Sequence, residues 1–219
     1  MEIVRLGALG GLLGLDATGV GQFMLSRPLV AGALTGWLLG DIATGATIGI
    51  LLELYLLVSF PTGGARFPEG STATVVAVAC AVPISGAGAM PLAIAMGLVW
   101  GQVGGGTITA QRQLNSRLVP EPGDPRSSPR AVVTAHLAAI GLDFARAAAI
   151  TFTGVLVGRA VLRTLVERWP LSVPSSMGLL LVGGAVSAGI LLRDLGGFRR
   201  RRVWFAAGLG LGIVGARLL

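Results

Sequence analysis

The sequence predicts an all-α polytopic membrane protein, built as a glycine-rich bundle of transmembrane helices with broken or re-entrant segments in its N-terminal third. Composition, long apolar segments and glycine spacing lead to this prediction. The 219 residues are 53% hydrophobic and only 12% charged, whereas a soluble domain has roughly 25% charged residues. The mean hydropathy is +0.79. This composition is typical of a membrane protein.

Apolar segments recur along the whole chain. A helix needs about 20 apolar residues to cross the hydrocarbon core, and six stretches approach or exceed that length: 3–24, 28–60, 71–101, 131–158, 173–192 and 203–219. A single secretory signal peptide would not account for all of them. We therefore predict one membrane domain over 1–219, with an extramembrane loop at 112–130.

The basic residues indicate the orientation of this domain. All 17 are arginines, and they concentrate in the gaps between apolar segments, above all in 112–130 and 199–202. Both gaps should be cytoplasmic, since arginine-rich loops stay on that side. The gap between 158 and 173 also carries three arginines, which opposes this orientation. We interpret the net charge of +7 as a topology signal of a membrane protein, and not as a nucleic-acid-binding surface.

Glycine makes up 35 residues of the chain, well above the ordinary fraction of about 7%. Many of these glycines are four residues apart, which clears one helix face and lets another backbone approach closely. We therefore expect a densely packed bundle. The spaced groups are Gly32, Gly36 and Gly40; Gly45 and Gly49; Gly97, Gly101 and Gly105; Gly154 and Gly158; Gly208 and Gly212.

The first 70 residues concentrate acidic side chains and helix breakers. They hold half of the ten acids, and an ionised side chain near the bilayer centre costs at least about 2.5 to 3.5 kcal/mol. Such residues normally face a cavity, pair with each other or line a substrate path. The stretch FPTGGARFPEG at 60–70 interrupts the apolar sequence. It is either a broken segment facing protein or water, or an ordinary extramembrane turn.

Several short motifs resemble the membrane IIC component of the mannose/sorbose family of the bacterial phosphoenolpyruvate-dependent sugar phosphotransferase system. The resemblance is most specific in the first third of the chain. A looser match continues through the 112–130 region and through HLAAIGLDFARA around His136. The motif positions are Asp16, the pattern Gln22, Phe23, Arg27 and Pro28, the run Leu39 to Asp41, the LLEL around Glu53, and Gly63 to Glu69.

This resemblance implies a sugar permease subunit for a mannose-type hexose. It implies a homologous IID membrane subunit as partner, in a trimer of IIC/IID pairs, and cytoplasmic IIA and IIB proteins that pass a phosphoryl group to the sugar. The IIC subunit would supply the translocation path without catalytic residues or a cofactor, so enzymatic activity of this chain is left open. The chain departs from the family where VPEPGDPRSSPR replaces a charged helical stretch.

Four residues are the predicted sugar ligands. Neutral sugars are bound best by carboxylates and amides in a mostly apolar pocket. Asp16, Gln22, Glu53 and Glu69 have that chemistry. Glu53 is the strongest candidate, because no basic residue lies within ten positions on either side to offset its charge.

Three further charged residues are assigned to structure. Arg27 is expected to pair with a nearby acid, so that neither charge is left alone in a low dielectric. Asp41 follows a glycine in LLGDIATG, where it fits a helix N-cap and a sugar ligand equally well. Arg66 is assigned to charge pairing or capping within 60–70.

The residue pattern does not indicate histidine catalysis, a metal site or a phosphate-binding loop. The only histidine, His136, has no neighbouring acid or second histidine, so we interpret it as structural. No cysteine or histidine pair has the spacing of a metal site, and GGGTIT at 104–109 lacks the lysine of a phosphate loop. Two alternatives stay open: the solute-binding membrane subunit of an ATP-driven transporter, and a non-transporting scaffold or sensor.

Overall fold

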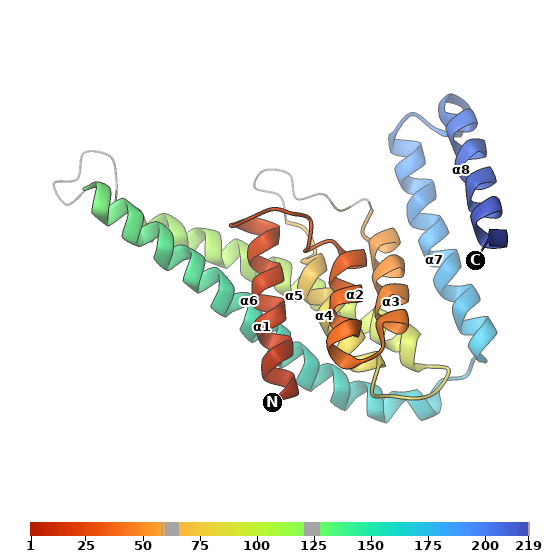
Figure 1. Cartoon of the computed structure of the whole chain (residues 1–219), viewed down its shortest axis with the longest axis horizontal. Coiled ribbons are helices and arrows are strands. Elements are labelled where there is room, and N and C mark those ends of the chain that lie inside the picture. The colour runs from red at the N-terminus through yellow and green to blue at the C-terminus, as the bar shows by residue number, and fades with distance from the viewer. Residues whose placement is uncertain (58, 60–65, 121–127, 219) are drawn as a thin grey trace.

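The computed structural model describes residues 1–57, 59, 66–120 and 128–218, and within these ranges every regular element is helical. Figure 1 shows a compact group of short helices, a long helical hairpin extending from it, and a C-terminal helix pair at one side. The elements are α1 Glu2–Thr18, α2 Pro28–Leu39, α3 Ile42–Tyr55, α4 Gly70–Ala81, α5 Ala89–Leu118, α6 Pro129–Leu165, the 3₁₀ turn η1 Val166–Arg168, α7 Val173–Asp194 and α8 Phe198–Leu218.

Two of the expected membrane spans are broken in the structure. The segment 28–60 contains α2 and α3, of 12 and 14 residues, and 71–101 contains α4 and the start of α5. At 1.5 Å per residue, α2 and α3 are about 18 and 21 Å long, too short for a hydrocarbon core of about 30 Å. Neither apolar stretch is therefore a single continuous helix. Whether α2 and α3 re-enter the membrane stays a prediction.

Glycine brings α2 and α3 into backbone contact. Gly32 lies against the carbonyl oxygen of Gly45, and Gly49 lies against that of Pro28, so neither site has room for a side chain. The chain reverses at Gly40, whose φ of 82° is the left-handed conformation that glycine adopts freely. Gly97, Gly101, Gly154 and Gly158 also lie at helix contacts, and Gly105 lies against Phe67, which precedes α4. Gly208 faces open space, and the surroundings of Gly212 lie outside the description.

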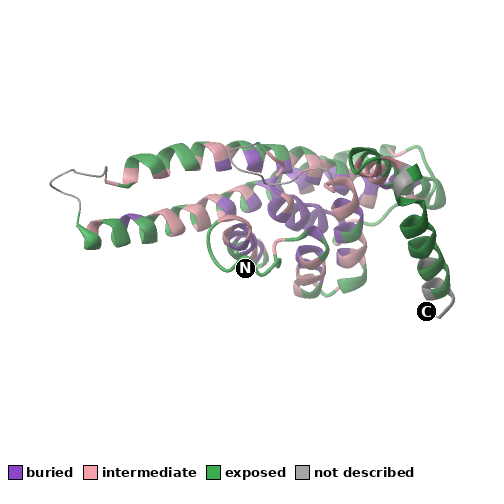
Figure 2. Cartoon of the chain, turned by 90° about the horizontal axis from the view of Figure 1, so that it is seen from above, coloured by how far each residue is buried: buried purple, intermediate pink, exposed green. Residues whose placement is uncertain are grey.

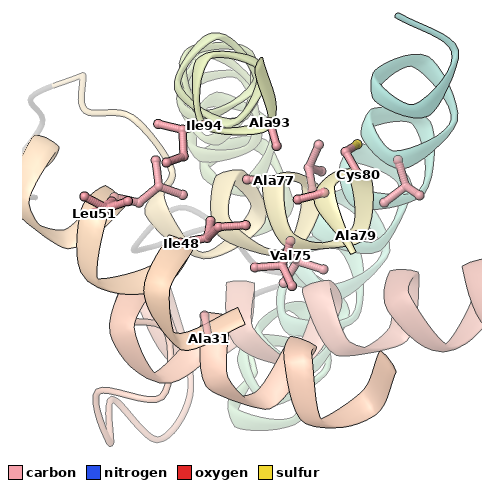
Figure 3. Packing of buried hydrophobic residues seen from close by; sticks show 14 of the residues in the cluster. Ala31, Ile48, Leu51, Val75, Ala77, Ala79, Cys80, Ala93 and Ile94 are labelled. Atoms are coloured by element: carbon pink, nitrogen blue, oxygen red, sulfur yellow. The ribbon is translucent and has the colours of Figure 1, made fainter. Parts of the chain in front are cut away.

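Helix α4 forms the centre of the core. Every residue from Ser71 to Ala81 is buried, and α4 packs against α1, α2, α3, α5 and α6. Figure 3 shows Val75, Ala77 and Ala79 surrounded by Ile48 of α3 and Ala93 of α5. Small and β-branched side chains fill this space with few rotamers to restrict. The apolar composition of this segment, which suggested a membrane span, therefore reflects burial within the protein.

Helices α5 and α6 form the long hairpin. They contain 30 and 37 residues, about 45 and 55 Å of helix, so they extend well beyond the short helices (Figures 1 and 2). Helix α5 continues to Leu118 and α6 begins at Pro129. Both helices thus enter the expected loop 112–130, of which 121–127 lie outside the described residues. That this end is cytoplasmic stays a prediction.

Three described helices are long and apolar enough to cross a membrane: α5, the continuous segment Pro129–Arg168, and α7. Large hydrophobic side chains on α6 and α7, such as Leu156 and Val182, are exposed in the isolated chain. The C-terminal α8 is exposed along most of its length (Figure 2). Exposed apolar helix faces of this kind are matched to lipid or to other membrane subunits.

Candidate functional site

A cavity of about 620 Å³ lies where the α5–α6 hairpin leaves the short helices. The C-terminal end of α1 and the following loop close it on one side, and the hairpin closes it on the other. Its lining mixes apolar groups with carboxylates, amides and cationic side chains. The lining residues are Asp16, Ala17, Thr18, Gly19, Gln22, Met24, Ser26, Arg27, Phe67, Ile108, Gln111, Arg112, Asn115, His136, Ala139, Ile140 and Asp143.

Two helical stripes give the cavity its long axis. On α5 the lining positions are 108, 111, 112 and 115, and on α6 they are 136, 139, 140 and 143, the spacing that places side chains on one helix face. Because the two helices run antiparallel, Ile108 lies at the same end as Asp143, and Asn115 at the same end as His136. We call these ends the inner end, near the core, and the outer end, toward the tip of the hairpin.

Asp16 organises the loop between α1 and α2. Its side chain accepts hydrogen bonds from the backbone N–H groups of Phe23, at 2.7 Å, and Ser26, at 2.8 Å. The loop also contains two non-glycine residues with positive φ, Gln22 at 53° and Met24 at 64°. Such backbone is uncommon outside glycine and needs fixed partners to persist. Asp16 supplies them, and Gln22 is thereby held at the cavity wall.

A buried charge network supports the inner end. Arg146 of α6 donates to both carboxylate oxygens of Glu69, at 2.8 and 3.1 Å, and its Nε donates to Asp143 Oδ1 at 3.0 Å. The side chains of Arg146 and Glu69 are only 8% and 1% exposed. Thr72 donates to Glu69 at 2.9 Å, and Thr18 of α1 donates to Asp143 at 2.5 Å. The network therefore joins α1, the start of α4 and α6 directly beneath the cavity.

Arg27 and Glu53 form a second, more exposed ion pair. Arg27 Nη2 contacts Glu53 Oε1, and the side chains are 51% and 21% exposed. Glu53 also accepts from the backbone N–H of Leu29, at 3.3 Å, in the first turn of α2. No basic residue lies within ten positions of Glu53 in the sequence, but the α2–α3 hairpin brings Arg27 to it from 26 positions away. Arg27 is thus paired with an acid, as the sequence predicted.

The predicted sugar ligands fall into two groups. Asp16 and Gln22 line the cavity, whereas Glu53 and Glu69 are absent from its lining. Glu69 is engaged by Arg146 and Thr72 as described above. A carboxylate whose oxygens are already hydrogen-bonded at 1% exposure has no free face for a solute. The geometry supports a structural function for Glu69 and Glu53.

The remaining charged candidates also lie outside this cavity. Asp41 caps α3, since its side chain accepts from Thr44 N at 3.0 Å, and it lines a separate, smaller cavity of about 260 Å³ near α7. Arg66 is exposed and makes no ion pair with any residue in the described ranges. Most of the segment 60–70, at 60–65, lies outside the described residues.

Sequence reasoning missed the α5 and α6 contributions to the cavity. Asp143 and Arg146 stand three residues apart in the otherwise apolar GLDFARAAA, so the cost of charge in a membrane could have singled them out. Gln111, Arg112 and Asn115 were assigned to the expected loop or its edge. His136 was interpreted as structural, yet it lines the outer end. Among the described residues no histidine, cysteine and acid cluster has the makeup of a metal site.

A comparison with protein families identifies the chain's relatives. The family model described as "PTS system sorbose-specific iic component" matches residues 1–193. The chain belongs to this family. The all-helical fold and the three long apolar helices agree with a multi-pass membrane component of a sugar phosphotransferase system.

Two curated relatives match parts of the chain. A protein of Escherichia coli (strain K12), provisionally named N-acetylgalactosamine permease IIC component 2, is 35% identical to this chain over 82 residues. These residues are 37% of this chain and 61% of that protein. The sorbose-specific EIIC component of Klebsiella pneumoniae is 26% identical over 102 residues, or 40% of this chain and 38% of that protein. These matches span less than two thirds of either relative.

Solved structures share the fold over almost the whole chain. One described as a membrane protein superposes with a TM-score of 0.75 at 19% identity, and covers 99% of this chain and 92% of its own. The mannose transporter ManYZ in complex with microcin E492 superposes with a TM-score of 0.54 at 20% identity and the same coverage. At these identities the likeness concerns the fold alone.

Proposed function

We propose that this chain is the membrane permease subunit of a phosphoenolpyruvate-dependent sugar phosphotransferase system, and that the 620 Å³ cavity is where it binds a mannose-type sugar. Membership in the sorbose IIC family supports the transport system. The cavity carries the assignment of the site, because it combines amides, carboxylates and apolar surface around a volume suited to a small ligand. The expected location is the bacterial cytoplasmic membrane.

The cavity offers both donors and acceptors to a sugar. Gln111 and Asn115 of α5 are hydrogen-bonded to each other at 2.8 Å, which orients their remaining amide groups. Gln22 approaches from the α1–α2 loop. Each amide can donate and accept at once, as a ring of sugar hydroxyls requires. We therefore assign sugar binding to Gln22, Gln111 and Asn115, with Asp16 holding the loop that carries Gln22.

The proposal includes partner proteins. A homologous IID subunit would cover apolar faces of the bundle in a trimer of IIC/IID pairs, and IIA and IIB proteins would deliver the phosphoryl group from the cytoplasm. This chain contributes the sugar path and no catalytic residue or cofactor. The structural likeness to a transporter described as ManYZ supports a fold of this kind and leaves the partners to be tested.

Transport with the cognate partners tests the proposal, using two glutamines of one helix. Gln111 lines the cavity, whereas Gln113 is exposed and lies outside the lining. Phosphoenolpyruvate-dependent uptake of labelled mannose, sorbose and N-acetylgalactosamine is measured in membrane vesicles. At sub-saturating sugar, Gln111→Ala should lower uptake roughly threefold to tenfold, since one or two hydrogen bonds are lost. Gln113→Ala should leave uptake within about twofold of the parent.

Gln22→Ala is expected to behave like Gln111→Ala. Equal uptake by the Gln111→Ala and Gln113→Ala proteins would remove the site from this cavity. No phosphoenolpyruvate-dependent uptake of any of the three sugars would count against the transport function itself. Recovery of the chain with an ATPase in place of a IID-like subunit would favour the ATP-driven alternative.

A further inference from the structure

The acids that face the cavity accept hydrogen bonds from within the protein. Asp16 accepts two backbone N–H groups, and Asp143 is paired with Arg146 and accepts from Thr18. Arg27 is likewise engaged with Glu53. The lining charges that remain for a ligand are therefore not those of the inner end. The remaining charge belongs to Arg112 at the outer end, where His136 adds a hydrogen-bonding side chain.

Arg112 is held at the cavity by an aromatic ring. Its guanidinium carbon lies 5.8 Å from the centroid of the Phe67 ring, a cation–π distance, and both residues line the cavity. In the described ranges Arg112 forms no ion pair. A ring contact orients a guanidinium but leaves its in-plane N–H groups available, and these match the oxygens of a phosphoryl group.

The cavity is therefore chemically asymmetric along its axis. The inner end has acceptors and hydroxyls fixed by the Arg146 network, and the outer end has the cationic Arg112 with His136, Gln111 and Asn115 as further hydrogen-bonding groups. A neutral solute would need no cation at one end. A sugar that carries a phosphoryl group would place its hydroxyls inward and its negative charge outward.

We propose that the outer end of the cavity, with Arg112 as its main residue, recognises a phosphoryl group attached to the sugar, so that the cavity binds a sugar phosphate more tightly than the parent sugar. This inference rests on the proposed function, since the sugar occupies the same cavity. It adds a ligand class, the phosphorylated product, and a position for its charge. His136 is a secondary hydrogen-bond donor at this end.

The experiment measures how much affinity the phosphoryl group adds. The full-length chain, with any membrane subunit that co-purifies, is kept in a polyoxyethylene detergent free of sugar and phosphate. Dissociation constants are obtained by calorimetry for mannose and mannose 6-phosphate, sorbose and sorbose 1-phosphate, and N-acetylgalactosamine and its 6-phosphate. The readout is the ratio of the two constants within each pair. Inorganic phosphate as competitor tells whether the anion must be attached to a sugar.

A matched arginine provides the control. Arg112→Gln should reduce the affinity ratio about tenfold, the expected effect of one charge-assisted contact, and His136→Gln should reduce it less. Arg117→Gln removes an exposed arginine of α5 that is not part of the lining, and should leave the ratio unchanged. Weak competition by inorganic phosphate, with tight binding of the sugar phosphate, would identify the sugar-linked group as the ligand.

The outcomes separate the two proposals. If a sugar binds and its phosphate binds no better, or if Arg112→Gln retains the whole gain, the phosphoryl site is wrong and the permease assignment stands. If inorganic phosphate competes as strongly as the sugar phosphate, the outer end is a general anion site and the sugar-specific inference is overturned. If neither sugars nor sugar phosphates bind, both proposals fail.

Discussion

The two ion pairs around the cavity contain the same chemical groups in different surroundings. Beneath the inner end, Arg146 and Glu69 are 8% and 1% exposed and share a network with Asp143. Arg27 lines the cavity and its partner Glu53 does not, and their side chains are 51% and 21% exposed. Breaking a buried pair leaves an uncompensated charge in a low dielectric, whereas an exposed pair is screened by solvent.

The sequence alone cannot distinguish two functions of a carboxylate in an apolar segment. Such a carboxylate can bind a ligand or form half of an ion pair, and either interaction offsets the cost of burying its charge. The inner pair connects α4 to α6 and fixes Asp143 at the cavity floor, so it determines the shape of the site. The Arg27–Glu53 pair connects the start of α2 to α3, and through Arg27 it reaches the lining of the cavity.

The largest expected effect is that of breaking the inner pair. Glu69→Gln removes the charge that Arg146 contacts with two nitrogens, while Asp143 stays as its partner. We expect a loss of about 1.5 to 3 kcal/mol in the free energy of unfolding, the range for a hydrogen bond to a charged group, because Asp143 still neutralises Arg146. Denaturant unfolding in detergent measures it.

Arg146→Met is the matched comparison for this change. It removes the cation and leaves the two acids Glu69 and Asp143 without their charged partner, whereas Glu69→Gln leaves Arg146 paired with Asp143. Arg146→Met should therefore be less stable than Glu69→Gln. If instead Glu69→Gln unfolds at the same denaturant concentration as the parent, the network contributes nothing measurable and Glu69 must be reconsidered as a ligand.

Breaking the Arg27–Glu53 pair is expected to have an effect of intermediate size. A double-mutant cycle with Arg27→Ala and Glu53→Ala should give a coupling free energy below about 1 kcal/mol, since Arg27 is half exposed. Sugar uptake by Glu53→Gln should fall less than that by Gln111→Ala, because Glu53 can act on the cavity only through Arg27. A tenfold loss of uptake in an assembled Glu53→Gln protein would restore Glu53 as the sugar ligand that the sequence suggested.

The sequence predicted the fold class, but it did not predict where the individual helices begin and end. Apolar composition identified the membrane protein, and the motifs around Asp16 and Gln22 identified both the family and one wall of the cavity. Hydropathy did not show that the segment 28–60 breaks into two helices at Gly40. Helices α2 and α3 pack against each other through glycine backbone, so the sequence is apolar both before and after the break. An apolar run shows that a segment avoids water, but not whether lipid or protein covers it.

The sequence named only some of the residues that line the candidate site, and it could not show which acids are held in long-range ion pairs. The partners of Glu53 and Glu69 lie 26 and 77 positions away, beyond the reach of any local charge pattern. The α5 residues of the cavity were assigned to a loop, since polar side chains after an apolar segment normally mark its end. Here helix α5 continues to Leu118 and presents those polar side chains on one face to the cavity.

The smallest effect is expected at the pair between Arg159 and Glu2. The two side chains meet at 2.6 Å and are 16% and 54% exposed, so solvent screens the acid. Arg159 also donates to the carbonyl oxygen of Ala79, at 2.9 Å, in the last turn of α4, where helix carbonyls lack helical partners. Glu2→Gln should lower the free energy of unfolding by less than about 0.5 kcal/mol, because Arg159 keeps this bond. Arg159→Ala should cost more, since the carbonyl then loses its donor, and equal losses in the two variants would show that exposure does not rank the ion pairs of this protein.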